Sequence, residues 1–134
     1  MATRILVVND TAEILDMFRL LLEGEGYEVI LASFPVQRVE ELEALHPDLI
    51  ILDLMFGDEK LGWQMLEMIK LQRSTKAIPI IVCTAAAQTV REQEGYLTSQ
   101  GIRVLYKPFD IDDLLAMVKS AAATSKNAMK NKEA

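Results

Sequence analysis

The sequence predicts an α/β protein, with a doubly wound, five-stranded parallel sheet that helices cover on both faces. Apolar, β-branched runs alternate with helical patterns five times in succession, as in a series of βα units. Runs such as "LIIL" (49–52) and "IIVC" (80–83) lack polar alternation, which is typical of strands buried on both faces. The length of 134 residues suits one domain with a single core.

Each element follows from its local pattern. The apolar runs predict strands at 4–8, 27–31, 48–52, 78–83 and 102–106. Apolar residues spaced three and four apart predict helices at 11–23, from about Pro35 to Pro47, at 62–71, at about 88–99 and at 111–123. Glycines at 24 and 26 end the first helix, and Pro35 suits a first helical turn. We expect a folded domain at 1–123 and a polar, disordered tail at 124–134.

Composition narrows the class of protein. An apolar content of 51% with 25% charged residues is that of a globular protein, and the net charge of −6 argues against direct binding to nucleic acid or to an anionic membrane. No apolar stretch approaches the roughly 20 residues that span a bilayer, and the N-terminus lacks a signal-peptide pattern. A single cysteine, Cys83, excludes an internal disulfide. We therefore expect a cytoplasmic protein.

Polar residues stand where the predicted strands end. Asn9 and Asp10 follow the first strand, Asp53 the third, Thr84 the fourth and Lys107 the fifth. Ligands of open α/β sheets bind at the carboxyl ends of the strands, so these side chains are expected to converge on one crevice. Asp53 would otherwise be a costly carboxylate in an apolar segment.

These groups suit one kind of chemistry. Two carboxylates about 4 Å apart repel by about 4 kcal/mol at an effective dielectric of about 20, and a magnesium ion with carboxylate ligands relieves this repulsion. A lysine suits a phosphoryl oxygen, and a carboxylate can itself attack phosphorus to form an aspartyl phosphate.

Five segments in this order resemble the receiver domain of two-component response regulators. They are "ILVVND", "PDLIILDLM", "GWQMLEMIK", "IPIIVCTA" and "LYKPFDIDDLL", and the resemblance covers about residues 4 to 122. It implies the flavodoxin-like (βα)5 fold with the strand order 2-1-3-4-5.

The resemblance also implies a role for each matching residue. Asp53 would accept a phosphoryl group from a histidine kinase or a phosphotransfer protein. Asp10 and Asp53 would ligate Mg2+ together with the backbone carbonyl of Met55. Thr84 would bond to the phosphoryl oxygen and Lys107 would pair with it.

Further expectations concern the surroundings and the output. The Lys107–Pro108 bond is expected to be cis, and Ala85 places a small side chain beside the site. The domain would not be an enzyme beyond self-phosphorylation and self-dephosphorylation. The self-dephosphorylation would be slow, because Met55 and Ala86 cannot orient an attacking water. The fourth helix, fifth strand and closing helix would bind a downstream protein, and a homodimer is compatible with this.

Besides the apolar residues Met55 and Ala86, the chain departs from the family pattern at three places. Asn9 replaces an acid, which predicts weaker magnesium binding. Val104 occupies the position of the usual aromatic residue, three before the lysine, and Tyr106 on the same face is a candidate replacement. The loop "LMFGDEKLGW" has Gly57 where a proline is usual, and Gly62 comes one residue late.

Alternatives stay open at this point. Asp10 could be a cap of the first helix as well as a metal ligand. The chain could be a pseudo-receiver that binds a protein without taking phosphate. A magnesium phosphatase would need a second aspartate at the position of Met55, and a flavodoxin-like cofactor binder would need a phosphate-binding loop in place of the acidic "NDTAE".

Overall fold

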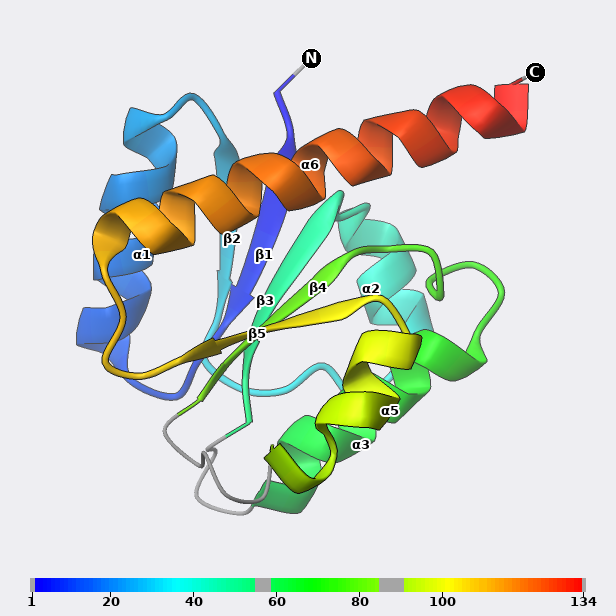
Figure 1. Cartoon of the computed structure of the whole chain (residues 1–134), viewed down its shortest axis with the longest axis horizontal. Helices are drawn as coiled ribbons and strands as arrows, with labels where there is room; N and C mark the ends of the chain where they lie inside the picture. Colours follow the sequence, from blue (N-terminus) through cyan, green and yellow to red (C-terminus); the bar gives the residue numbers. More distant parts are fainter. Residues whose placement is uncertain (1, 55–58, 85–90, 134) are drawn as a thin grey trace.

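The computed structural model describes residues 2–54, 59–84 and 91–133, which form a parallel sheet between two layers of helices (Figure 1). The strands are β1 (Arg4–Val8), β2 (Glu28–Ala32), β3 (Leu49–Asp53), β4 (Ile80–Thr84) and β5 (Ile102–Tyr106). Their order is β2-β1-β3-β4-β5, and every neighbouring pair is parallel. The predicted fold class and strand order are confirmed.

The helices divide between the two faces of the sheet. They are α1 (Ala12–Gly24), α2 (Val39–Leu45), α3 (Glu59–Leu71), α5 (Glu94–Ser99) and α6 (Ile111–Glu133). Figure 1 shows α1 and α6 on one face and α2, α3 and α5 on the other. None of the helices in the described ranges is long and apolar enough to cross a lipid bilayer.

Two apolar clusters hold these layers to the sheet. Alternate residues of each strand point to opposite faces. Ile5 and Val7 of β1 therefore belong to the cluster beneath α1 and α6, which includes Phe18. Leu6 and Val8 belong to the cluster beneath the other helices. Each inner strand thus contributes to both clusters, which explains the apolar runs without polar alternation.

Several predicted helix boundaries are wrong. The second helix begins at Val39, not near Pro35, because residue 38 is still extended (φ −125°, ψ 132°). Val36 reaches the core from this preceding segment, at 9% exposure. The last helix does not end at 123 but continues to Glu133, so residues 124–133 of the expected disordered tail are helical. No glycine or proline follows residue 110 to stop it.

Only part of the fourth predicted helix, at about 88–99, can be compared with the structure, because residues 85–90 lie outside the described ranges. Its described part includes α5. The third predicted helix starts three residues earlier than Gly62, at Glu59.

Gly62 sets how closely α3 approaches the end of β3. A Cβ atom at this position would lie 2.9 Å from Leu54 Cα and 3.1 Å from the Leu54 carbonyl oxygen. Both atoms belong to the backbone, which cannot move aside as a flexible side chain would. Glycine therefore lets the helix rest directly against the chain that leaves Asp53.

Candidate functional site

The carboxyl ends of the strands carry the polar residues that the sequence singled out. Asp53 ends β3 and Thr84 ends β4, while Asn9 and Lys107 directly follow β1 and β5. Asp53 stands beside Cys83 in the register of β3 and β4. Because all strands are parallel, these ends meet at the same edge of the sheet, as expected.

Asp53 is a buried carboxylate with two donors on one oxygen. The residue is 5% exposed. Its Oδ2 atom accepts a hydrogen bond from Asn9 Nδ2 at 2.8 Å and an ion-paired hydrogen bond from Lys107 Nζ, also at 2.8 Å. A buried charge is tolerated when it is paired and hydrogen-bonded. These contacts explain how a strand of apolar residues can end in an acid.

Asn9 is held from both ends of its side chain. Its Oδ1 atom accepts the backbone N–H of Thr11 at 2.8 Å, while its Nδ2 group donates to Asp53. The backbone N–H of Asn9 donates to the carbonyl of Ala32 on β2, at 3.1 Å. The residue is 2% exposed. Its contact with Asp53 was not predicted from the sequence, which marked Asn9 only as a missing charge.

Asp10 follows Asn9 in the segment between β1 and α1 and is exposed. Thr11 Oγ1 donates to its Oδ1 atom at 3.3 Å. The cap residue of α1 is Thr11, and it makes no side-chain capping bond. The alternative of Asp10 as the helix cap is therefore wrong.

The donor set fits magnesium in its chemistry. Asp10 and Asp53 would supply carboxylate oxygens from segments that follow or end adjacent strands, and magnesium needs only one or two carboxylates because it keeps several waters. The third expected ligand, the carbonyl of Met55, and the expected neighbour Ala85 lie outside the described residues. Within those ranges no three His, Cys, Asp or Glu side chains cluster as a metal site.

Lys107 is anchored through its backbone as well as its side chain. Its N–H donates to the carbonyl of Thr84 at 3.0 Å. The following peptide bond, Lys107–Pro108, is cis, so that prediction is confirmed. Thr84 itself is fully buried at the end of β4, directly beside Tyr106 in the register of β4 and β5.

Cys83, the single cysteine of the chain, is a neighbour of the site, because it pairs with Asp53 in the register of β3 and β4. It is 1% exposed and packs in the cluster beneath α1 and α6. Burial raises the pKa of its thiol to about 12; Lys107 lowers this pKa and Asp53 raises it. At neutral pH the thiol is therefore protonated and unreactive.

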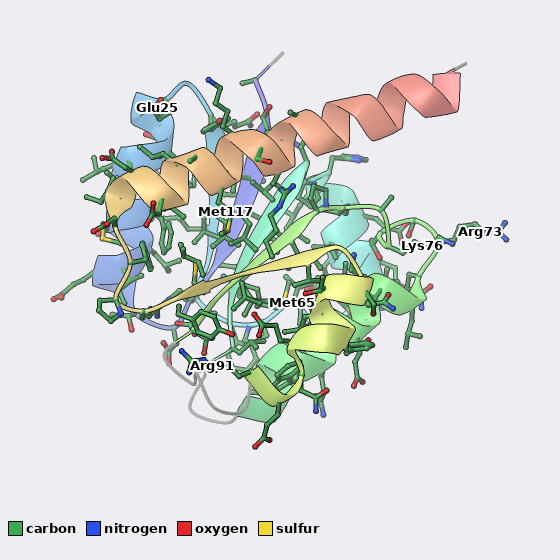
Figure 2. The ribbon with its side chains drawn as sticks, in the orientation of Figure 1. Glu25, Met65, Arg73, Lys76, Arg91 and Met117 are labelled. Carbon is green, nitrogen blue, oxygen red and sulfur yellow. The ribbon has the colours of Figure 1, made fainter. Side chains whose placement is uncertain are left out.

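Tyr106 carries a buried polar atom at the end of its ring. Its ring packs against the cluster beneath α3 and α5, as Val104 does. Its hydroxyl oxygen is buried and finds no hydrogen-bond partner in the part of the chain that the structure describes. The guanidinium carbon of Arg91 lies 5.4 Å from the ring centroid. Figure 2 shows Arg91 just before α5, at the end of the molecule where the strands of the sheet finish.

Comparison with known proteins decides the family. The profile of the response regulator receiver domain matches residues 5–119. The chain belongs to the response regulator receiver domain family. Receiver domains are regulatory domains that accept a phosphoryl group in two-component systems and are generally not enzymes.

Relatives of this receiver domain include DNA-binding regulators. It is 32% identical over 120 residues to the DNA-binding response regulator MtrA of Mycobacterium tuberculosis, which covers 90% of this chain and 50% of the relative. It is 33% identical over 120 residues to the phosphate regulon transcriptional regulatory protein PhoB of Klebsiella pneumoniae, covering 90% of this chain and 52% of that one. The chain thus spans about half the length of the curated relatives it matches.

Solved structures show the same fold. The CheY-like receiver domain protein of Methanospirillum hungatei superimposes with a TM-score of 0.81 at 27% identity, over 96% of this receiver domain and 99% of that chain. The N-terminal domain of a receiver protein from Methanoculleus marisnigri gives 0.65 at 35% identity, over 87% and 94%.

Proposed function

We propose that Asp53 accepts a phosphoryl group from a histidine kinase or a phosphotransfer protein, and that this changes the surface on which a partner protein binds. The observation that carries the proposal is the 2.8 Å ion pair between the buried Asp53 carboxylate and Lys107. It places an acid and a cation together at the edge of the sheet where ligands bind.

The transfer forms one bond and breaks another. A carboxylate oxygen of Asp53 forms a bond to phosphorus while the bond from phosphorus to the histidine nitrogen of the donor breaks, and its electron pair stays on that nitrogen. Lys107 lies within reach to pair with a phosphoryl oxygen once the Asp53 carboxylate, its present partner, has become an acyl phosphate. Thr84, on the adjacent strand, supplies a hydroxyl donor to the same group.

Magnesium would be held by Asp10, Asp53 and the carbonyl of Met55. When bound, it neutralises the negative charge that the acid and the phosphoryl oxygens bring together. Asn9 and Lys107 hold and orient the acceptor, because both donate to the Oδ2 atom of Asp53.

Intact-mass spectrometry tests the acceptor directly. Incubation with acetyl phosphate and magnesium should add the mass of one phosphoryl group to the wild type and nothing to Asp53→Asn, which has the same shape without a nucleophilic carboxylate. An unchanged wild-type mass would contradict the proposal. That result would instead favour the pseudo-receiver, the second candidate, which Asn9 supports because the site has one acid fewer than the family pattern.

The output surface is proposed to be the α5–β5–α6 face. A groove of about 720 Å³ lies there between the two helices, with Val104 and Met117 among its apolar lining and Glu94, Arg103 and Asp113 among its charges. This mixture suits a protein partner or a second copy of the chain rather than nucleic acid.

The single buried cysteine without a disulfide is compatible with a cytoplasmic location.

Tyr106 is proposed to connect the acceptor to this surface. It stands beside Thr84 in the sheet, and Arg91 covers its ring. A buried hydroxyl without a hydrogen-bond partner costs about 1–3 kcal/mol. The Tyr106 hydroxyl has none among the described residues, so a rearrangement that supplies one would be favoured. If Tyr106→Val left phosphorylation-dependent partner binding intact, this role would be refuted.

A further inference from the structure

Asn9 differs from the other residues of the site because it touches the acceptor without bringing a charge. Its amide group lies 2.8 Å from Asp53 Oδ2, the same oxygen that Lys107 contacts. Both residues of this contact are buried, so water cannot easily replace it.

The orientation of the Asn9 amide is determined by its neighbour in the chain. The backbone N–H of Thr11 can only donate, so the atom facing it at 2.8 Å must be the Oδ1 acceptor. The Nδ2 group then has to face Asp53, where a carboxylate accepts it. An amide turned the other way would lose both bonds.

An aspartate at position 9 would have the same shape but the opposite effect. It would keep the bond from Thr11 and place a second carboxylate oxygen against Asp53 Oδ2. The buried site would then hold two negative charges against one lysine, and a divalent cation would be needed to relieve the repulsion.

We propose that Asn9 is a positioning residue that holds the Asp53 carboxylate in place without any ion, so that the geometry of the acceptor does not depend on a bound cation. With Asn9, the charge of the buried Asp53 carboxylate is balanced by the half-buried Lys107, and the chain itself supplies the contacts to Asp53 Oδ2 from Asn9 and Lys107. This inference uses the proposed function only in taking Asp53 as the acceptor.

Thermal unfolding of Asn9→Asp, in EDTA and in magnesium, tests the proposal without any phosphorylation. In EDTA the Tm of Asn9→Asp should fall by about 4 °C or more below that of the wild type, and magnesium should restore most of the loss. The same addition of magnesium should change the wild-type Tm less. An unchanged Tm of Asn9→Asp in EDTA would overturn the proposal.

The Asp53→Asn background separates positioning from a general packing role. There the negative partner is gone, so adding Asn9→Asp should cost little in EDTA. An equal fall of the Tm in both backgrounds would show that the effect of Asn9→Asp does not depend on the charge of Asp53. That result would overturn the proposal whatever the outcome of the acetyl phosphate experiment.

A measurement on the wild type covers the case in which the variants fail to fold. The Asn9 side-chain amide should give resolved NMR signals in EDTA that are protected from exchange with water. Rapid exchange of these protons would contradict the bond to Asp53 and the proposal with it.

Discussion

At the scale of single residues, close contacts at the carboxyl edge of the sheet limit which substitutions each position tolerates. Gly62 illustrates this with backbone atoms alone, because a Cβ there would meet Leu54 Cα at 2.9 Å. The sequence showed that Gly62 departs from the family spacing, but a contact between two backbones has no signature in a sequence.

Gly62→Ala should lower the free energy of unfolding by about 1–3 kcal/mol, because α3 must move away from the end of β3. Urea denaturation measures this. Gly95→Ala is the matched control: it also lies in a helix, but its added Cβ meets nothing within 4 Å, so it should gain up to about 1 kcal/mol. Equal losses in both variants would contradict the assigned contact.

Cys83 should make stability depend on alkaline pH. The folded state keeps the thiol proton up to about pH 12, whereas the unfolded thiol loses it near its ordinary pKa of 9.0. The contribution is therefore fully present below pH 9 and is lost as the pH rises toward 12, by about 1.4 kcal/mol per pH unit. Denaturation of the wild type between pH 8 and about 10.5 should show a steeper decline than that of Cys83→Ala. Parallel declines would refute the assignment.

Which residues would meet at the site was predictable, whereas their contacts were not. Asn9, Asp53, Thr84 and Lys107 follow from parallel strands that share one edge. The bond from Asn9 to Asp53 depends on side-chain rotamers and on the turn at Thr11, which determines the amide orientation. A sequence pattern contains neither.

At the scale of elements, strands were predicted better than helix ends. Apolar runs gave β1 and β5 with their observed bounds, because burial on both faces leaves few other interpretations. Periodicity could not distinguish whether Val36 reaches the core from a helix or from an extended segment, so α2 was placed too early. Residues 124–133 are polar, and polarity alone does not distinguish a disordered tail from a helix, so the extension of α6 to Glu133 was not predicted.

The domain boundary at 123 remains a prediction that truncation can test. Ala121 and Ala122 are the last side chains of α6 described as buried, and Figure 1 shows the end of this helix running past the sheet. A chain ending at Ala123 should therefore keep its Tm within about 3 °C of the full chain. Ending it at Ser120 removes both buried alanines and should lower the Tm further. A large loss from the first truncation would place the boundary later.

At the scale of the whole molecule, the sheet should make the two helical layers unfold together. Each inner strand sends alternate residues into both apolar clusters, so neither layer can separate without exposing the other. Trp63 packs against one cluster and Cys83 lies in the other. Tryptophan fluorescence and thiol labelling should therefore report the same urea midpoint. Two distinct midpoints would show that the layers are independent.

The alternation of side chains along the strands also separates two steps of the proposed function, which are the transfer of the phosphoryl group to Asp53 and the response of Thr84 to it. Asp53 shares its side of the sheet with Leu49 and Ile51, in the layer of α1 and α6, whereas Thr84 shares the opposite side with Ile80 and Val82. The acceptor and the hydroxyl proposed to respond to it thus lie on opposite faces of the sheet and come together only at its carboxyl edge. A phosphate donor docked against α1 would leave the α5 surface uncovered, so donor and partner protein could be bound at the same time.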